Sequence, residues 1–224
     1  MSNNLKIESH DYLRSLYRYL NGDLEQFQRL CTEIEMKEIT DKGIPDLNLG
    51  SMFNPNELDK YYRNETFFEN EDHFRLTIPI TLSLMAVIDL LGYLTGDNDN
   101  PLETKKKFQE FFKVRPNNFN HFYIDILNDV FRQGLVHVYF PKLNLGIKYH
   151  SSNPKGKLFF INTKSNIFLN VNELEEIVIQ TFRYILSNLN EFESIETRYQ
   201  KMINDYKKRL APKVSDLLGH LVIE

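Results

Sequence analysis

The sequence of 224 residues contains no tryptophan and only one cysteine, Cys31. A single cysteine cannot close a disulfide within the chain, and it excludes a zinc site built from several cysteines. Residues 1–20 also lack the apolar stretch and the small-residue cleavage site of a secretory signal peptide. These absences predict a cytoplasmic protein.

Most sequence motifs of catalysis and cofactor binding are absent as well. The chain has no Walker A loop, no GxGxxG turn and no HExxH pair, which are signatures of phosphate, dinucleotide and zinc sites. The six histidines do not have the spacing of metal ligands. We therefore expect no bound metal and no cofactor.

One long apolar run, residues 76–96, raises the question of a membrane span. It contains Asp89, and Pro79, Thr81 and Ser83 interrupt it. A charged side chain within a bilayer is energetically costly, whereas a helix that is apolar on nearly every side suits the centre of a large helical core. The run predicts a central buried helix and no membrane association; a transmembrane helix is the alternative.

Apolar residues recur at helical spacing along most of the chain. They predict helices at residues 10–20, 22–38, 78–95 and 118–140, a short helix after Pro55, another from Pro101 to about residue 114, and a last, interrupted one from Asn172 to about residue 210. Asn172 and Glu175 have the spacing of a capping box, with Asn as the N-cap.

Three short β-rich runs lie between residues 145 and 170 and are separated by turn sequences. The predicted fold class is mostly α (α+β), a helical bundle with a small antiparallel β-meander inserted before the last long helix. We divide the chain into an N-terminal helical region, residues 1–70, and a domain at residues 71–224 that contains the β-insert.

The net charge of −4 conceals an uneven distribution along the chain. Residues 1–100 carry 9 basic and 18 acidic side chains, whereas residues 101–170 carry 11 basic and 4 acidic ones. A positive middle segment could attract a polyanion such as RNA. The alternative is that folding mixes the segments into a surface of both signs.

One motif, VFRQGLVHVYFPK at residues 130–142, stands apart from the rest of the sequence. Four residues separate Arg132 from His137, and both flanks are apolar. The motif resembles the R-x4–6-H signature of the HEPN superfamily, a group of helical domains. Arg115 and His121, with five residues between them, also satisfy this signature, but they lie in a Pro- and Asn-rich segment, and we interpret that pair as a chance match.

The HEPN resemblance, over about residues 74–205, implies a helical domain of a family that includes metal-independent endoribonucleases and non-catalytic relatives. It also implies a homodimer in which Arg132 and His137 of both protomers meet in a shared cleft as catalytic residues. Gln133 matches the polar residue that often follows the Arg in the family. The β-insert at about 145–170 is not part of the basic family unit.

The chemistry of RNA cleavage fits these two residue types. Histidine titrates near neutral pH and can act as general base or acid. Arginine stays charged and offers a planar fork to two phosphate oxygens. The structural alternatives are a hydrogen-bonded core or helix-end histidine for His137 and, for Arg132, an ion pair with Asp89.

A basic segment follows the motif, with five lysines and no acidic residue between positions 142 and 164. Cations contact phosphates, and aromatic rings stack on unpaired bases. The residues that we predict to bind substrate are Gln133, Lys142, Lys148, His150, Lys155 and Lys157. The alternative is that lysines on edge strands prevent aggregation of the sheet.

Three functions are therefore open from the sequence. The first is a HEPN-like RNA-binding protein or metal-independent endoribonuclease that acts as a homodimer. The second is a non-catalytic HEPN-like module that binds a nucleotide, a nucleic acid or a protein. The third is an unrelated α-helical interaction protein in which the motif is a coincidence.

Overall fold

The computed structural model describes residues 2–40, 72–96, 103–114, 121–133, 146–151, 153–161 and 167–220. The predicted fold class is confirmed: the chain is mostly helical, and a small sheet precedes the last long helix. In chain order the elements are α1 (Ser2–Thr40), α5 (Asp72–Thr95), α6 (Thr104–Lys113), α7 (His121–Ile126), the π-helical turn η1 (Leu127–Arg132), β1 (Gly146–Lys148), β2 (Phe159–Ile161), β3 (Ile167–Asn170), α9 (Val171–Ser187), the 3-10 turn η2 (Leu189–Glu191) and α10 (Ser194–His220).

Helix α5 is the centre of the structure, as its apolar sequence predicts. It packs against α1, α6, α9 and α10, and its core side chains, such as Leu84, Ile88 and Leu91, have no exposed surface. The hydroxyl of Thr81 is buried and donates to the carbonyl of Thr77, so this polar group is satisfied within the helix. By length and composition, Thr77–Thr95 could also cross a membrane, but 61% of that stretch is buried inside the structure.

Helices α5 and α6 approach each other very closely at Gly92. A Cβ atom at this position would lie 1.8 Å from the carbonyl oxygen of Lys107, so only glycine permits the contact. Helix α6 then buries Phe108, Phe111 and Phe112 in the core. This contact fixes the part of α5 that follows Asp89.

Helix α1 is one continuous helix, so the prediction of two helices at 10–20 and 22–38 is wrong at their junction. Leu13, Leu20, Leu24 and Cys31 form one buried stripe that continues through Gly22. Burial of the whole stripe against the core outweighs the cost of about 1 kcal/mol for a glycine in a helix. The predicted boundary between the two domains, near residue 70, and the predicted helix after Pro55 lie outside the described residues.

The sheet differs from the predicted meander in one pairing. Its order is β1-β3-β2; β2 pairs antiparallel with β3, as expected, but β1 pairs parallel with β3 and not with β2. The side-chain amide of Asn170 donates to the carbonyls of Pro154 and Lys157. These bonds hold the connection between β1 and β2 against the end of β3. Strand β2 lies on the opposite side of β3 from β1.

The start of helix α9 also differs from the prediction. Asn170, not Asn172, is the N-cap, and its side chain accepts from the backbone N–H of Glu173. The side chain of Asn172 instead accepts from the backbone N–H of His150 and from the amide of Asn153. Asn170 therefore caps the helix, and Asn172 holds the preceding loop.

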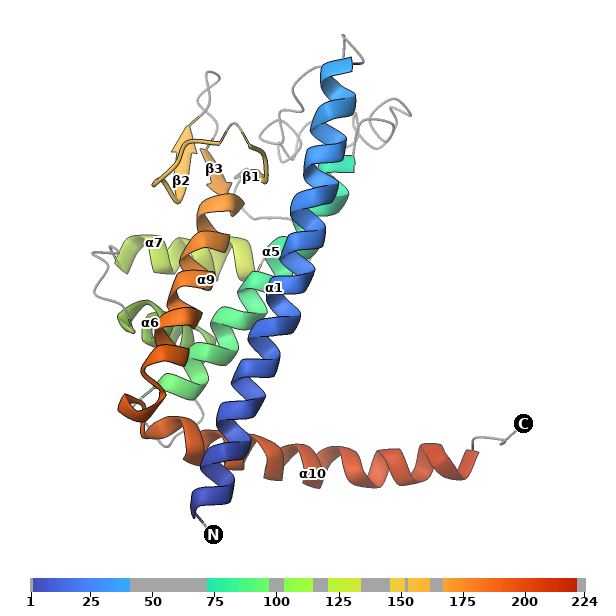
Figure 1. Cartoon of the computed structure of the whole chain (residues 1–224), viewed down its shortest axis with the longest axis vertical. Coiled ribbons are helices and arrows are strands. Elements are labelled where there is room, and N and C mark those ends of the chain that lie inside the picture. Colours follow the sequence, from blue (N-terminus) through green and yellow to red (C-terminus); the bar gives the residue numbers. More distant parts are fainter. Residues whose placement is uncertain are drawn as a thin grey trace.

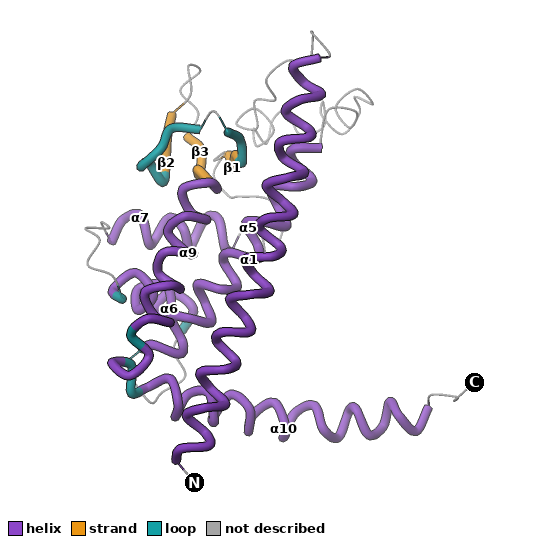
Figure 2. Tube along the Cα trace, viewed as in Figure 1, coloured by secondary structure: helices purple, strands orange, loops and turns teal. Residues whose placement is uncertain are grey.

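The elements form a helical body with the sheet at one end (Figure 1). Helices α1, α5 and α9 run along the body, and the strands lie beyond α7 and the first turn of α9 (Figure 2). After a break at residues 188–193, helix α10 turns across the base of the body and extends well away from it (Figure 1). The predicted interruption of the last helical region is thus confirmed.

Candidate functional site around Arg132

Arg132 is the last residue of the π-helical turn η1. Leu127, Val130 and Phe131 of this turn are buried and anchor it against the core. A π-turn is rare and occurs frequently at functional sites. Because these side chains pack in the core, the turn holds Arg132 in a fixed position.

The guanidinium of Arg132 is held by Asp89 of the central helix α5. Nη2 and Nε of Arg132 lie 3.0 Å and 3.3 Å from the same carboxylate oxygen, Oδ2. Both side chains are 20% exposed. The ion pair that was one interpretation of the sequence is confirmed. Because the two bonds use Nε and Nη2, the Nη1 donors take no part in the pair.

Asp89 has a further feature at this position. Its second oxygen, Oδ1, is buried and has no hydrogen-bond partner among the described residues. The carboxylate therefore depends on Arg132 for its pairing. Removal of either partner would leave a partly buried charge uncompensated, which is destabilising.

The other residues of the motif are placed only in part. Gln133 is half-buried, and its backbone N–H donates to the carbonyls of Asn128 and Val130 at the end of the π-turn. His137 and Lys142 lie outside the described residues. The predicted meeting of Arg132 and His137 in one cleft therefore stays a prediction.

Strand β2, which is part of the basic segment, lies against the helical segment that carries Arg132. The ring centre of Phe159 on β2 is 5.9 Å from that of Phe131 and 5.4 Å from that of Tyr123. Lys155 and Lys157 are exposed in the connection before β2. Gly156 between them adopts a positive φ of 72°, and its N–H donates to Glu173. The two lysines therefore sit beside a carboxylate at the start of α9.

Lys148 in β1 and His150 just after it lie at the edge of the sheet opposite β2. Lys148 is half-buried in β1, and His150 Nδ1 is 3.8 Å from Oε1 of Glu35 on α1. His150 is thus directed toward α1. The structure brings it together with a group of residues that sequence reasoning did not identify.

This group, which we call the α1/α9 polar cluster, is formed by Gln28, Cys31, Glu35, Tyr149, His150, Ser151 and Glu175. Glu35 accepts hydrogen bonds from the backbone of Ser151 and from the Cys31 thiol. Burial acts to raise the pKa of Glu35, but these bonds and the nearby His150 outweigh it, and the pKa is lowered.

Glu175 lies at the centre of the α1/α9 polar cluster and is 7% exposed. Burial raises its pKa, although hydrogen bonds from Tyr149 and Gln28 oppose that effect. The pKa of Tyr149 is raised as well, first by burial and then by the Glu175 carboxylate. The sequence signal was weak: Glu175 follows Leu174 and precedes Ile177 within an apolar stripe.

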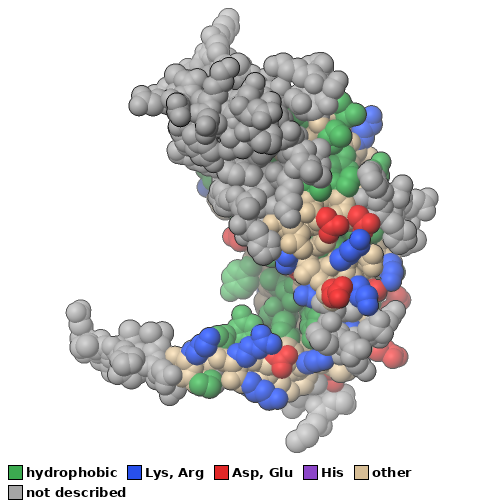
Figure 3. Space-filling view, turned by 180° about the vertical axis from the view of Figure 1, so that it is seen from behind, with side chains coloured by type: hydrophobic (Ala, Val, Ile, Leu, Met, Phe, Trp, Pro, Cys, Tyr) green, Lys and Arg blue, Asp and Glu red, His purple; other side chains and the backbone are tan. Residues whose placement is uncertain are grey.

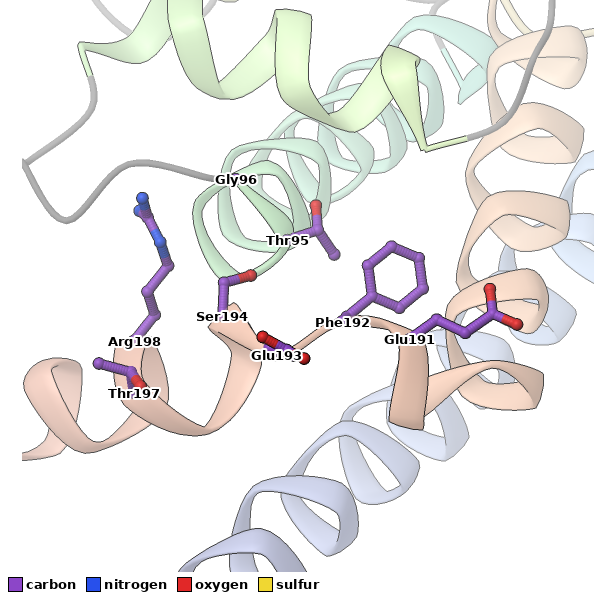
Figure 4. A pocket seen from close by; sticks show the side chains of 8 residues that line it. All are labelled: Thr95, Gly96, Glu191, Phe192, Glu193, Ser194, Thr197 and Arg198. Carbon is purple, nitrogen blue, oxygen red and sulfur yellow. The ribbon is translucent and has the colours of Figure 1, made fainter.

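Two hollows flank α10 where it leaves the body. One, of about 440 Å³, lies between the end of α5 and the first turn of α10 (Figure 4). Arg198 extends along it toward Gly96; this side chain is 4% exposed, and its guanidinium lies 5.0 Å from the ring centre of Tyr93. Glu191 and Glu193 line the same hollow, so its charge does not favour an anion.

The second hollow is a groove of about 660 Å³ between α5 and α10, and Asp89 is among its lining residues. The carboxylate that holds Arg132 thus also borders this groove. Among the described residues, no group of three or more His, Cys, Asp or Glu side chains is arranged to hold a metal ion.

Comparisons of this chain with protein-family models, with curated proteins and with solved structures find no match.

Proposed function

We propose that this protein is a HEPN-like RNA-binding protein that cleaves RNA without a metal ion, through Arg132 and His137. The observation that carries the proposal is the arrangement of Arg132. Its guanidinium is one-fifth exposed, is held from one side by Asp89 and stands at the end of a π-turn. A fixed, partly desolvated guanidinium is suited to bind a phosphate diester.

In the proposed reaction, the ribose 2′-oxygen attacks the adjacent phosphorus and the 5′-oxygen leaves. A base removes the 2′ proton and an acid protonates the leaving oxygen, which gives a 2′,3′-cyclic phosphate and a 5′-hydroxyl. His137 supplies one of these proton transfers, because its imidazole titrates near neutral pH. Arg132 stabilises the extra negative charge on the phosphorane oxygens through its Nη1 donors.

Asp89 acts in this proposal as a positioning residue. It takes both Nε and Nη2 of Arg132 on one oxygen, so the guanidinium is fixed before the substrate binds. A preorganised donor is more effective than one that must be ordered during the reaction. Asp89 comes from the central helix α5, whose core side chains are buried, and this makes the support rigid.

The proposed protein acts as a homodimer in the cytoplasm, with no cofactor. Two protomers would each supply Arg132 and His137 to a shared cleft, as the HEPN resemblance implies. Lys148, Lys155, Lys157 and the segment around Lys142 would guide the RNA, with Gln133 next to the reacting phosphate. Lys155 and Lys157 are exposed in the connection that leads into β2, and Phe159 of β2 packs against Phe131 of η1, which supports this path.

The test is cleavage of a labelled single-stranded RNA in EDTA by the purified full chain. Arg132→Ala and His137→Ala should each lower the rate at least about 100-fold. Arg115→Ala and His121→Ala, the second pair that satisfies the R-x4–6-H signature, are matched controls and should retain the wild-type rate. Cleavage that survives both motif changes would overturn the catalytic assignment.

The dimer is tested by mixing the two inactive variants. If the sites are shared, a mixed dimer of Arg132→Ala and His137→Ala contains one site with both residues intact, and about a quarter of the activity should return. No recovery from stable, folded variants that exchange subunits would argue against a shared cleft.

A second candidate function is a non-catalytic helical module. The same Arg132–Asp89 pair favours it, because a half-buried ion pair that links η1 to α5 also serves to fix their relative position. In that case RNA is not cleaved by the wild-type protein, and Arg132→Ala reduces stability without a change in any chemical activity.

A further inference from the structure

The groove between α5 and α10 has an apolar floor that the described structure leaves uncovered. Leu90 of α5 and Met202, Tyr206 and Leu210 of α10 line it. Tyr206 is 61% exposed and Leu210 is 39% exposed. Figure 3 shows hydrophobic side chains in the angle where α10 leaves the body, and Lys and Arg side chains along the helix.

The floor of the groove is the outer part of a continuous apolar stripe on α10. Near the body, Ile195 of this helix is buried at 1% exposure. Farther out, Met202, Tyr206 and Leu210 follow at intervals of four residues, which places them on one face. A contiguous apolar stripe that is exposed on a helix marks an interaction surface.

The rim of the groove is mainly basic. Lys107 of α6 and Lys201, Arg209 and Lys213 of α10 line it, against the carboxylates of Asp89 and Asp205. Across residues 194–213, α10 carries six basic and two acidic side chains. The surface around the apolar floor therefore attracts negative charge.

The charges distinguish between the occupants that an apolar groove could have. A second copy that paired α10 with α10 would place two positively charged helices side by side, which is repulsive. A nucleic acid strand carries a phosphate on every nucleotide, so part of its charge would meet Asp89 and Asp205, whereas a helix can confine its carboxylates to the flanks that face the basic residues. A helix with an apolar face and acidic flanks matches both the floor and the rim.

We propose that the groove between α5 and α10 binds an acidic amphipathic helix of a partner protein. The partner helix lies along α10 and inserts its apolar side chains between Leu90 and Leu210, and its carboxylates pair with the lysines and the arginine of the rim. This is the helix-in-groove mode of recognition, with aromatic, Met and Arg side chains of the kind enriched at interfaces. The inference does not depend on RNA cleavage.

The test uses a fluorescent synthetic peptide of about 18 residues with leucines at i, i+3, i+4 and i+7 and glutamates elsewhere. Its binding to the full chain is measured by fluorescence anisotropy. The wild-type protein should bind with a Kd in the micromolar range, and the double charge reversal Lys201→Glu with Arg209→Glu should weaken binding at least about tenfold.

The matched control is Lys207→Glu with Lys208→Glu. It makes the same change in net charge on the same helix, but neither residue lines the groove. Binding to this variant should stay within about threefold of wild type. A peptide with lysines in place of the glutamates should not bind, and Leu210→Asp, at an exposed position, should abolish binding without loss of helix content by circular dichroism.

Three results would overturn the proposal. The first is absence of peptide binding to the folded wild-type protein, and the second is an equal loss in both double variants. The third is an effect of the groove variants on a different ligand only: weaker binding of a single-stranded RNA, or dissociation of a dimer in sedimentation velocity, with unchanged peptide binding. Weaker RNA binding would assign the groove to RNA, and dissociation of a dimer would assign it to a second copy of the chain.

Discussion

The Arg132–Asp89 pair and the α1/α9 polar cluster both place charged side chains at the edge of the same core, but they use their hydrogen-bonding groups differently. In the cluster, carboxylates accept from side chains and backbone groups on separate elements, as Glu35 does from Ser151 and Cys31. In the pair, one carboxylate oxygen takes two bonds from the arginine, and the other oxygen has no described partner. A saturated cluster holds elements together, whereas an open pair, as far as the described residues go, has the Nη1 donors of Arg132 left for a ligand.

The largest expected difference between the two regions lies in activity. Arg132→Lys keeps the charge but removes the planar fork, so RNA cleavage should fall about 100-fold with an unchanged fold. Single-turnover cleavage rates of the variant and of Glu175→Gln, a change in the α1/α9 polar cluster, provide the comparison. A loss of activity of the same size in Glu175→Gln would contradict the assignment of function to the Arg132 region.

Asp89→Asn tests whether the open pair positions Arg132. The amide keeps the shape of the carboxyl but not its charge, so the guanidinium is held less firmly, and kcat should fall about tenfold with little change in KM. The variant should also lose about 1–2 kcal/mol of unfolding free energy, because Arg132 then lacks its partner in a partly buried place. A change in KM alone would instead indicate a role in binding, and rescue by Asp89→Glu would support the positioning role.

Glu175→Leu tests the saturated cluster. The change removes a buried carboxyl and leaves the hydroxyl of Tyr149 and the amide of Gln28 without this partner, so stability should fall by about 1–3 kcal/mol. Urea unfolding measures this loss. The cleavage rate of the folded variant should match that of wild type, and Glu175→Gln should be closer to neutral in stability because the amide still accepts a hydrogen bond.

The smallest expected effect concerns the two glutamates of the cluster, whose contributions to stability depend on pH with opposite sign. The pKa of Glu175 is raised above its usual 4.5 by burial, so its contribution to stability is present below that value and is lost as pH rises through the folded pKa. The pKa of Glu35 is lowered from 4.5, so its contribution is present above that value and is lost as pH falls through the folded pKa.

Melting temperatures measured from acid to neutral pH separate the contributions of Glu175 and Glu35 to stability. Relative to wild type, Glu175→Gln should remove the decline in stability on the neutral side of 4.5, and Glu35→Gln should remove the decline on the acid side. Parallel curves for wild type and both variants would show that neither carboxyl changes its pKa on folding.

The sequence predicted those features that depend on composition over one helix. The apolar run at 76–96 identified the central helix because a helix that is apolar on nearly all sides must be buried. The same reasoning suggested the Arg132–Asp89 pair, since a lone carboxylate in such a helix requires a cation. The sequence also predicted that the last helical region is interrupted, but not where the break lies.

Features that depend on side-chain contacts between distant segments were not predictable. The parallel pairing of β1 with β3 is accompanied by hydrogen bonds of Asn170 to Pro154 and Lys157, 16 and 13 residues away. The α1/α9 polar cluster joins Gln28 to Glu175 across 147 positions. The periodicity of a single element does not indicate such contacts. The direction of α10 was not predictable for the same reason, because it is set by packing on α5 and α1.

The π-turn at Leu127–Arg132 has a consequence for the tolerance of this chain to deletions. A turn closed by i→i+5 bonds contains one residue more than an α-helical turn. Loss of one residue from it would leave an ordinary α-helical turn along the same path, because a π-turn uses one residue more for nearly the same rotation. The residues on either side of the turn would keep their direction, but the side chains within the turn would be redistributed around the helix axis. The extra residue thus decides which side chain of this turn stands opposite Asp89.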